Sequence, residues 1–341
     1  MPAEWEAVEA VLVAWPHEET DWNYMLDEVE DCYKHLCKAI ASYARLLVIG
    51  PEGALSRARK CLATITGEQV YFIPVQTNDT WTRDYGAISV ELPHAGGILP
   101  LDFKFNGWGL KFASDKDNLV TSRLAGMFAR MPENHLSFVL EGGSIESDGA
   151  GTILTTSECL QSPNRNGGMN REEIDEYLKY ALGARRILRL EHGGLRGDDT
   201  DSHIDTLARL APPGDVIFYT GCADASDEHY SELQTMAVEL RELRTEEGLP
   251  YHLIELPLPD PIYDAEDGSR LPATYANFLI VNHAVLLPIY GQPLKDRQAM
   301  DTIAVAMPDY EVVGVDCRAL IRQHGSLHCA TMQFPLNTLK I

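Results

Sequence analysis

The stretch His324-Gly325-Ser326-Leu327-His328-Cys329 stands near the end of the 341-residue chain, directly before a strand-like run at 330–334. Three other polar clusters also stand at the ends of strand-like runs, where loops held by a scaffold tend to gather binding residues. They read Asn-Asp-Thr-Trp-Thr-Arg-Asp at 78–84, Glu-Gly-Gly-Ser at 141–144 and Asp-Thr-Asp-Ser-His-Ile-Asp at 199–205. Together the four clusters supply a thiol, an imidazole, carboxylates and an indole, which could serve one chemical task.

Short apolar runs suited to buried strands recur along the whole chain, with helical stretches between some of them. The strand-like runs are 10–14, 46–50, 70–75, 99–105, 136–140, 152–155, 187–190, 216–219, 252–256, 278–281, 284–288 and 311–315. Apolar residues at helical spacing predict helices at 27–43, 54–63, 171–182, 228–247 and 295–307. Several strands occur per helix, which differs from the strict alternation of a (β/α)8 barrel. With no dinucleotide or P-loop motif and no linker, we expect one mixed α/β domain over 1–341.

The composition is strongly acidic, with 28 Lys and Arg against 51 Asp and Glu and a formal net charge of −23. Such a field repels nucleic acid and anionic membranes and concentrates cations, which favours a cationic substrate; acidity for solubility alone is the competing explanation. No apolar run is long enough to span a bilayer, and the first residues lack the features of a signal peptide. Seven scattered cysteines without a Cys-x-x-Cys pair predict a reduced, cytoplasmic protein.

The residue types in the clusters suit chemistry on a guanidinium, which is planar, cationic and a bidentate hydrogen-bond donor. Carboxylates would hold the group flat, a thiolate at Cys329 could attack its carbon, and His203 could protonate the departing amine. His203 and Asp205 are two residues apart, so on an extended strand both side chains would face one pocket. Trp81 would add attraction for a cation.

Blander interpretations compete with this one at each position. Cys329 could be an ordinary core residue of a strand, His203 a surface loop residue, and Glu-Gly-Gly a bulge. A metal-dependent hydrolase is a second alternative, since four side chains have suitable donor atoms; they are His203, Asp205, His324 and His328. A third is a non-catalytic, acidic binding protein for polyamines.

Taken together and in order, the clusters resemble the agmatine deiminase family, within the pentein superfamily that also holds bacterial peptidylarginine deiminases. The matching segments span nearly the whole chain. They are Trp15-Pro16-His17, 78–84, Phe105-Asn106-Gly107-Trp108-Gly109, 141–145, Cys159-Leu160, Asn164-Arg165-Asn166, His203-Ile204-Asp205 and 325–329. The resemblance implies an α/β fold, a five-bladed α/β propeller of ββαβ modules with pseudo-fivefold symmetry. No repeat of one fifth of the chain length, which five blades would give, is visible in the sequence.

The resemblance also implies roles for individual residues and hydrolysis of agmatine to N-carbamoylputrescine and ammonia, a step toward putrescine and polyamines. The implied site comprises the nucleophile Cys329, the acid/base His203, Glu141 beside it, the guanidinium-binding pair Asp84 and Asp205, and further substrate contacts at Trp81, Trp108 and Asn277. It implies no metal and no cofactor, a small cationic guanidino substrate, no nucleic acid or membrane partner, and leaves a homo-oligomer open. Arginine or peptidylarginine deimination and amidino transfer are the nearest alternatives.

Two features depart from the family pattern. Ser202 precedes the histidine where many relatives have glycine, a change that we expect to be tolerated. Glu18 and Glu19 follow the first motif at positions where charge varies among relatives, so the contact to the distal amine stays open. Arg165 is the basic residue that a substrate carboxylate would need.

Overall fold

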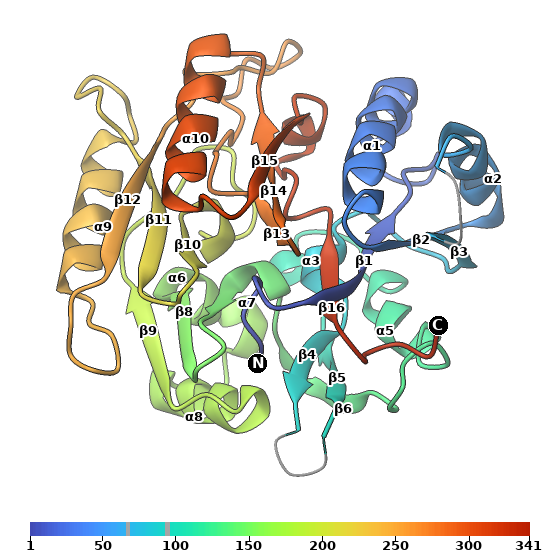
Figure 1. Ribbon diagram of the computed structural model, residues 1–341, viewed down its shortest axis with the longest axis horizontal. Coiled ribbons are helices and arrows are strands. Elements are labelled where there is room, and N and C mark those ends of the chain that lie inside the picture. Colours follow the sequence, from blue (N-terminus) through green and yellow to red (C-terminus); the bar gives the residue numbers. More distant parts are fainter. Residues whose placement is uncertain (66–68, 93–95) are drawn as a thin grey trace.

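The computed structural model describes residues 1–65, 69–92 and 96–341, and within these residues the strands form five small sheets (Figure 1). One sheet has the order β16-β1-β2-β3 (Met332–Pro335, Val8–Ala14, Arg45–Gly50, Val70–Pro74). The others are β4-β5-β6 (Ile88–Glu91, Ile98–Lys104, Glu133–Val139), β7-β8-β9 (Ile145–Ser147, Thr152–Thr156, Arg186–Leu190), β10-β11-β12 (Ala208–Ala211, Val216–Gly221, His252–Pro257) and β13-β14-β15 (Leu279–Val281, Ala284–Ile289, Glu311–Asp316).

Every sheet repeats one pairing scheme, in which the first strand pairs antiparallel with the second and the second pairs parallel with the third. A parallel pair needs a crossover connection, which a helix supplies. The long helices that follow the second strands are α1 (Leu26–Ala41), α8 (Arg171–Leu182), α9 (Tyr230–Glu242) and α10 (Pro293–Ala306). The α/β class expected from the sequence is therefore confirmed, built from several small mixed sheets.

The sheet of β16 joins the two ends of the chain. Its strand β16, from the C-terminus, pairs antiparallel with β1, and β2 and β3 follow in parallel with α2 (Glu52–Cys61) between them. The middle strand β2 carries the continuous apolar run Leu46–Ile49, typical of a strand covered on both faces. The residues after Cys329 and those of the N-terminus thus share one sheet.

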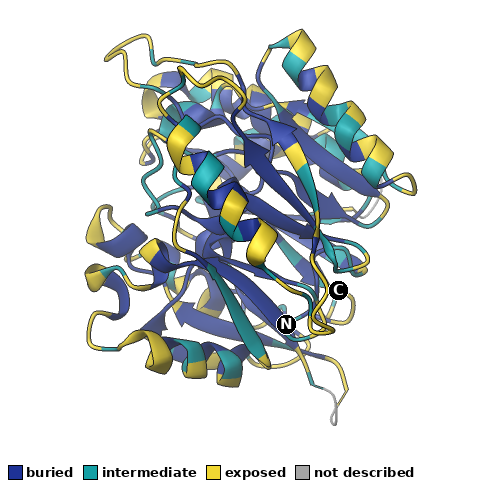
Figure 2. Cartoon of the chain, turned by 90° about the vertical axis from the view of Figure 1, so that its left-hand side faces the viewer, coloured by how far each residue is buried: buried dark blue, intermediate teal, exposed yellow. Residues whose placement is uncertain are grey.

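Helices cover the outside and strands form the inside (Figure 2). In α1 the predicted apolar stripe is buried, including Val29, Tyr33, Leu36 and Ile40, while the opposite face is exposed. Helix α8 begins with a capping box, in which Asn170 and Glu173 each accept a hydrogen bond from the other's backbone N–H. No helix in the described ranges combines the length and apolar character needed to cross a bilayer.

Each strand and each helix predicted from the sequence overlaps an observed one. The prediction missed β4, β7 and β10, which are three or four residues long, whereas the four-residue β16 overlaps the strand-like run at 330–334. Each of these four short strands begins a few residues after a polar cluster: β4 follows Asp84, β7 follows Glu141, β10 follows Asp205 and β16 follows Cys329. The turns that lead into the first strand of each module therefore carry the candidate chemistry.

Candidate active site

The turns before β4, β10 and β16 meet around a pocket. Three aromatic side chains and Cys329 line it together with a group of carboxylates. The aromatic residues are Trp81, Trp108 and Phe112, and the acidic ones are Asp21, Asp79, Asp84, Asp198 and Asp199. The five residues expected to carry the chemistry are all buried, with exposed fractions between 0% and 6%; they are Asp84, Glu141, His203, Asp205 and Cys329.

Cys329 lies between an amide that can donate to its sulfur and carboxylates that disfavour a negative charge there. Its Sγ is 3.3 Å from Asn277 Nδ2 and 3.8 Å from Asp205 Oδ2. Burial raises the pKa of the Cys329 thiol well above its usual range, and the carboxylates of Asp205 and Asp84 raise it further. The cysteine is therefore a protonated thiol until a cation enters the pocket.

Asn277 lies against the nucleophile and is fully buried. Its Oδ1 accepts a hydrogen bond from the backbone N–H of His328 at 2.9 Å, and its amide also contacts the backbone carbonyl of Asp205. This residue precedes β13, so the fifth module also contributes to the site. The sequence predicted a substrate contact for Asn277; in the structure its side chain contacts the sulfur of Cys329.

Asp84 sits on the short helix α3 (Thr82–Tyr85). Its Oδ1 accepts from the backbone N–H of Gly143 at 3.0 Å, and its Oδ2 accepts from Trp108 Nε1 at 3.0 Å. Burial raises the pKa of Asp84 to about 6, although the neighbouring His203 acts in the opposite direction. The carboxylate is thus fixed in orientation and gains from a cationic partner.

His203 lies between Glu141 and Asp84. Its Nε2 is 3.1 Å from Glu141 Oε2, whereas Nδ1 is 3.6 Å from Asp84 Oδ1 and has no hydrogen-bond partner among the described residues. Burial would lower the pKa of His203, but Asp84, Cys159 and Glu141 outweigh it and raise the pKa well above its usual value. The ring is therefore a cation that donates through Nε2 and holds a second proton at Nδ1.

Glu141 holds that ring in place and is itself held by Arg165. Nε of Arg165 lies 2.8 and 3.0 Å from the two oxygens of Glu141, and Nη1 of Arg165 is 2.5 Å from Asp201. Burial would raise the pKa of Glu141, but the hydrogen bond from His203 and the charge of Arg165 lower it. Arg165 is therefore engaged on both sides by carboxylates of the protein.

Asp205 has one occupied and one unoccupied oxygen. Its Oδ2 accepts from Nδ1 of His328 at 2.8 Å, and its buried Oδ1 finds no hydrogen-bond partner within the described part of the chain. Burial would raise the pKa of Asp205, but the hydrogen bond and charge of His328 lower it. An ionised, buried oxygen without a donor is costly, which indicates a site for a bound cation.

The geometry of His203-Ile204-Asp205 differs from the sequence-based expectation. Residues Ile204–Thr206 form a 3₁₀ turn, not an extended strand, so the alternation argument for this pair is wrong. The two side chains nevertheless reach the same place. A Cβ added at Gly143 would lie 2.7 Å from His203 Nδ1, 2.9 Å from Asp84 Oδ1 and 3.1 Å from Asp205 Oδ2. The second glycine of Glu-Gly-Gly therefore leaves the space around which these groups gather.

The two expected aromatic walls both line the pocket. Trp81 packs flat enough on Gly325 that a Cβ there would lie 2.4 Å from its ring. Trp108 has the left-handed backbone conformation, with φ of 53°, within α4 (Gly107–Leu110), and this places its indole N–H on Asp84. Strain of this kind at a non-glycine residue is common at functional sites.

The acidic mouth of the pocket was only partly foreseen. From the sequence, the variable charge at Glu18 and Glu19 left the contact to the substrate's distal amine open. In the structure Glu18 pairs with Arg57 and Glu19 with Lys116. The carboxylates that do line the pocket include Asp21, Asp198 and Asp199. Their signal in the sequence was the run of acidic residues before His203.

The metal ligands considered from the sequence do not converge. In the described residues, the side chains that gather closely enough for a shared ion are Glu141, Cys159 and His203 in one group and Glu4, Glu146 and His328 in another. Arg165 already pairs with the first group, and Arg209 with both acids of the second. His324 lies apart, bonded to the carbonyl of Gly197. The geometry favours thiol chemistry.

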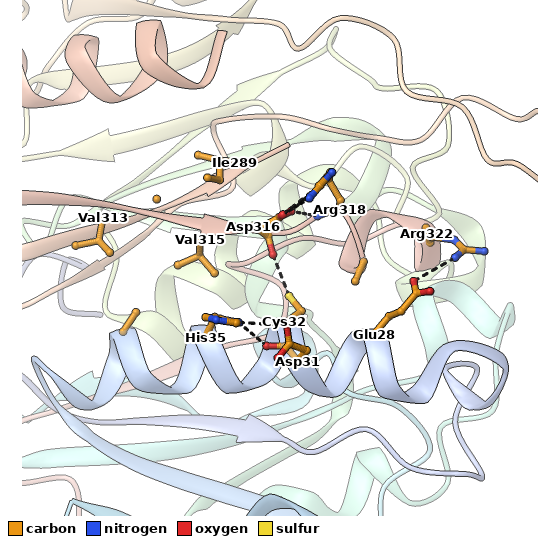
Figure 3. A pocket seen from close by; sticks show the side chains of 13 residues that line it. Glu28, Asp31, Cys32, His35, Ile289, Val313, Val315, Asp316, Arg318 and Arg322 are labelled. Atoms are coloured by element: carbon orange, nitrogen blue, oxygen red, sulfur yellow. Dashed lines mark hydrogen bonds and ion pairs between the residues drawn. The ribbon is translucent and has the colours of Figure 1, made fainter. Parts of the chain in front are cut away.

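A second, wider groove lies away from this site, between α1 and β15 (Figure 3). Its charged side chains face one another: Arg318 pairs with Asp316, Arg322 with Glu28 and His35 with Asp31. Its one imidazole, His35, is exposed, and among the described residues the groove has no counterpart of the buried His203 and the unpartnered Asp205 oxygen near Cys329.

Residues 1–335 match the family model of Porphyromonas-type peptidyl-arginine deiminases. A Legionella pneumophila protein provisionally named an agmatine deiminase is 35% identical, over 98% of this chain and 94% of that protein. A crystal structure from Porphyromonas gingivalis, provisionally named an arginine deiminase, is 48% identical with a TM-score of 0.92, covering 100% of this chain and 99% of that one. A cysteine-to-serine variant of the C. jejuni agmatine deiminase with substrate bound is 38% identical, with a TM-score of 0.89, covering 100% and 96%.

The electrostatic account of Cys329 predicts that Asp84→Asn makes the free thiol more reactive. Removing a nearby negative charge lowers the thiol pKa, so alkylation of Cys329 by iodoacetamide at pH 8 should accelerate by roughly threefold to tenfold. Peptide mass spectrometry gives the rate at this cysteine. Asp79→Asn, which removes a pocket carboxylate that is not among the charges raising the Cys329 pKa, is the control. Slower or unchanged alkylation in Asp84→Asn would contradict the account.

Proposed function

The chain belongs to the family of Porphyromonas-type peptidyl-arginine deiminases, and from this membership we propose that it is an agmatine deiminase. It hydrolyses agmatine to N-carbamoylputrescine and ammonia, which places it on a route to putrescine. One observation carries this proposal. A buried thiol, a buried imidazole and two buried carboxylates converge where Asp205 Oδ1 and His203 Nδ1 still lack partners.

Binding of the guanidinium uses the two carboxylates on either side of the thiol. Asp205 Oδ1 accepts from one edge of the guanidinium, and Asp84 accepts from the other while Gly143 and Trp108 hold it in place. Trp81 and Trp108 flank the alkyl chain. The bound cation then offsets the negative field that keeps Cys329 protonated, so the substrate itself activates the nucleophile.

In the first half-reaction a bond forms between Cys329 Sγ and the guanidinium carbon. The thiol releases its proton to solvent water, and one terminal amino group, protonated by His203 from Nδ1, departs as ammonia with the carbon–nitrogen bond electrons. What remains on the sulfur is a positively charged thiouronium that carries the aminobutyl chain. Glu141 keeps the imidazole in place through Nε2 during this transfer.

In the second half-reaction water replaces sulfur. His203, now neutral, takes a proton from water, whose oxygen attacks the same carbon, and the carbon–sulfur bond breaks. The product leaves as a neutral urea after its proton has restored the thiol, His203 is again protonated, and the proton that the thiol released in the first half-reaction converts ammonia to ammonium. The balance needs water alone, so we propose neither a metal nor a cofactor for the reaction.

The mouth of the pocket supports a cationic tail and not a carboxylate. Asp21, Asp198 and Asp199 line the pocket, whereas Arg165, the candidate for a substrate carboxylate, is paired with Glu141 and Asp201. Agmatine carries an ammonium at its far end, while arginine adds a carboxylate that these acids would repel. Because one relative is provisionally named an arginine deiminase, arginine is the competing substrate.

The proposal extends to the arrangement of the modules, the domain and the cellular compartment. We place the five modules around the central pocket as the blades of a pseudo-fivefold propeller, because each sheet has the same order and each contributes the turn before its first strand to the site. We keep residues 1–341 as one catalytic domain, and the seven cysteines, all free, support the cytoplasm as its compartment. A homo-oligomer stays open.

Replacing the nucleophile tests the reaction directly. We expect wild type to release ammonia from agmatine, and Cys329→Ala and Cys329→Ser to lose this activity by about a thousandfold or more while still binding agmatine, because a covalent step is removed. Cys222→Ala, at a cysteine outside the pocket, is the matched control and should stay active. Normal turnover by Cys329→Ala would end the covalent account, and agmatine binding without turnover in wild type would favour a polyamine-binding protein.

A comparison of substrates tests how the pocket recognises the end of the substrate that is distant from the guanidinium. Ammonia release from agmatine, free arginine and an arginine-containing peptide should rank agmatine first, with kcat/KM at least about a hundredfold above arginine, since a carboxylate facing several acids loses roughly 3 kcal/mol. A matched series without the distal ammonium, such as butylguanidine, separates recognition of the ammonium from repulsion of the carboxylate. Preference for arginine would overturn the substrate assignment.

The space at Gly143 is too small for a side chain. Gly143→Ala puts a methyl group within 3.1 Å of the acid/base and of both carboxylates, so kcat/KM should fall by about a hundredfold or more. Gly126→Ala, where an added Cβ meets nothing within 4 Å, is the control. Activity assays and melting curves of both variants show whether the loss is local to the site, and an active Gly143→Ala enzyme would refute the proposed packing.

A further inference from the structure

The first residues of the chain cross the middle of the molecule before β1 begins (dark blue in Figure 1). Met1 is anchored to two elements, because its ammonium donates to the carbonyl of Leu182 and its carbonyl accepts from Ser147. Between this anchor and β1 lies Glu4, which is only 9% exposed. A buried acid in a segment without secondary structure needs specific partners, and these lead to the active site.

Glu4 is bound by three donors. Its Oε2 accepts from His328 Nε2 at 2.7 Å, and its Oε1 accepts from the backbone N–H of Ile280 at 2.7 Å and lies 3.0 Å from Arg209 Nη2. Burial would raise the pKa of Glu4, but the charges of Arg209 and His328 outweigh it and lower the pKa, so the carboxylate stays ionised. Glu4 is therefore an anion in contact with the ring next to the nucleophile.

His328 lies between two carboxylates. Its Nε2 faces Glu4 and its Nδ1 donates to Asp205 Oδ2 at 2.8 Å, while Asn277 fixes its backbone N–H. Each ring nitrogen thus faces a carboxylate oxygen, and the ring cannot turn over without losing one of the two contacts. The oxygen of Asp205 that is not used by His328 is the unpartnered Oδ1.

Glu4 also lies between His328 and a fixed guanidinium. Its carboxylate is 2.7 Å from His328 Nε2 and 3.0 Å from Arg209 Nη2, and these two nitrogens are 3.1 Å apart. Arg209 cannot move away easily, because Glu146 holds it at 2.6 Å and Phe278 packs against its guanidinium. Without the carboxylate of Glu4, His328 Nε2 loses its acceptor and is left beside Arg209, so the ring is no longer held in its place beside Asp205.

We propose that Glu4 is a positioning residue for the reaction: it holds His328 in the orientation that occupies Asp205 Oδ2 and leaves Oδ1 turned toward the guanidinium. The inference rests on the proposed function and extends the site by a segment more than 320 residues from the nucleophile in sequence. Glu4 touches neither the pocket nor the sulfur, so its effect on the chemistry passes through His328 and Asp205.

The competing explanation is that Glu4 merely anchors the N-terminal segment. Glu6 provides the matched control, since its Oε1 accepts from the backbone N–H of Ala3 in the same segment but lies away from His328. A purely structural role predicts similar kinetic effects for Glu4→Gln and Glu6→Gln. The positioning role predicts a kinetic effect for Glu4→Gln alone.

The first experiment is a double-mutant cycle on agmatine turnover. Glu4→Gln should lower kcat/KM by about tenfold or more, and Glu6→Gln should leave it within about twofold. His328→Asn keeps a donor near Asp205 but is too short to reach Glu4, so adding Glu4→Gln to it should change kcat/KM by less than about twofold. A further tenfold loss in the double variant, or equal effects of Glu4→Gln and Glu6→Gln, would overturn the proposal.

The second experiment does not depend on turnover or on His328→Asn. Cys329 is alkylated with cationic 2-chloroacetamidine and with neutral 2-chloroacetamide, and the ratio of the two rates reports how well the carboxylates hold a cation beside the sulfur. Glu4→Gln should lower this ratio by about fivefold, and Glu6→Gln should not; an unchanged ratio in Glu4→Gln contradicts the positioning role. If wild type released no ammonia from agmatine, the proposed function would fail, while this ratio would still decide the role of Glu4.

Discussion

A buried thiol between two carboxylates is the constraint on which the site depends. Burial raises the pKa of Cys329, and Asp205 and Asp84 raise it further, so the protonated thiol is favoured in the free protein. The same two carboxylates can bind a guanidinium, and the positive charge of the bound guanidinium favours ionisation of the thiol. Substrate binding and nucleophile activation therefore depend on one electrostatic interaction, and a neutral molecule in the pocket does not switch on the sulfur.

Burying so many acids requires compensation, and the fold supplies it from a short helix at 163–166, from strand β10 and from the turn before β16. Arg165 compensates Glu141, and His328 compensates Asp205. Behind them Arg209 binds both Glu146 and Glu4, the latter from the N-terminal segment. Within the described residues His203 Nδ1 and Asp205 Oδ1 stay without partners, and both side chains reach the space beside Gly143, so the network that stabilises the buried charges also orients the reacting groups.

The sequence was informative about what is local and about side-chain chemistry. Apolar runs located the central strands such as β2, and helical spacing located α1, because both signals lie within a few residues. The short strand β7 was missed because three residues carry no periodicity, and the 3₁₀ turn at Ile204–Thr206 was missed because tertiary packing overrides alternation there. Glu4 could not be predicted, since its partner His328 is brought to it only by the closure of the chain, and the sequence does not set it apart from the neighbouring Glu6 and Glu9.

The central claim is that Cys329 carries the amidino carbon between two half-reactions, and rapid acid quench followed by mass spectrometry tests it most directly. During turnover of agmatine by wild type, the peptide containing Cys329 should gain the mass of agmatine less one ammonia, and the adduct should disappear as substrate is exhausted. Continued release of ammonia with Cys329 unmodified at every quench time, or an adduct at another cysteine, would contradict the account.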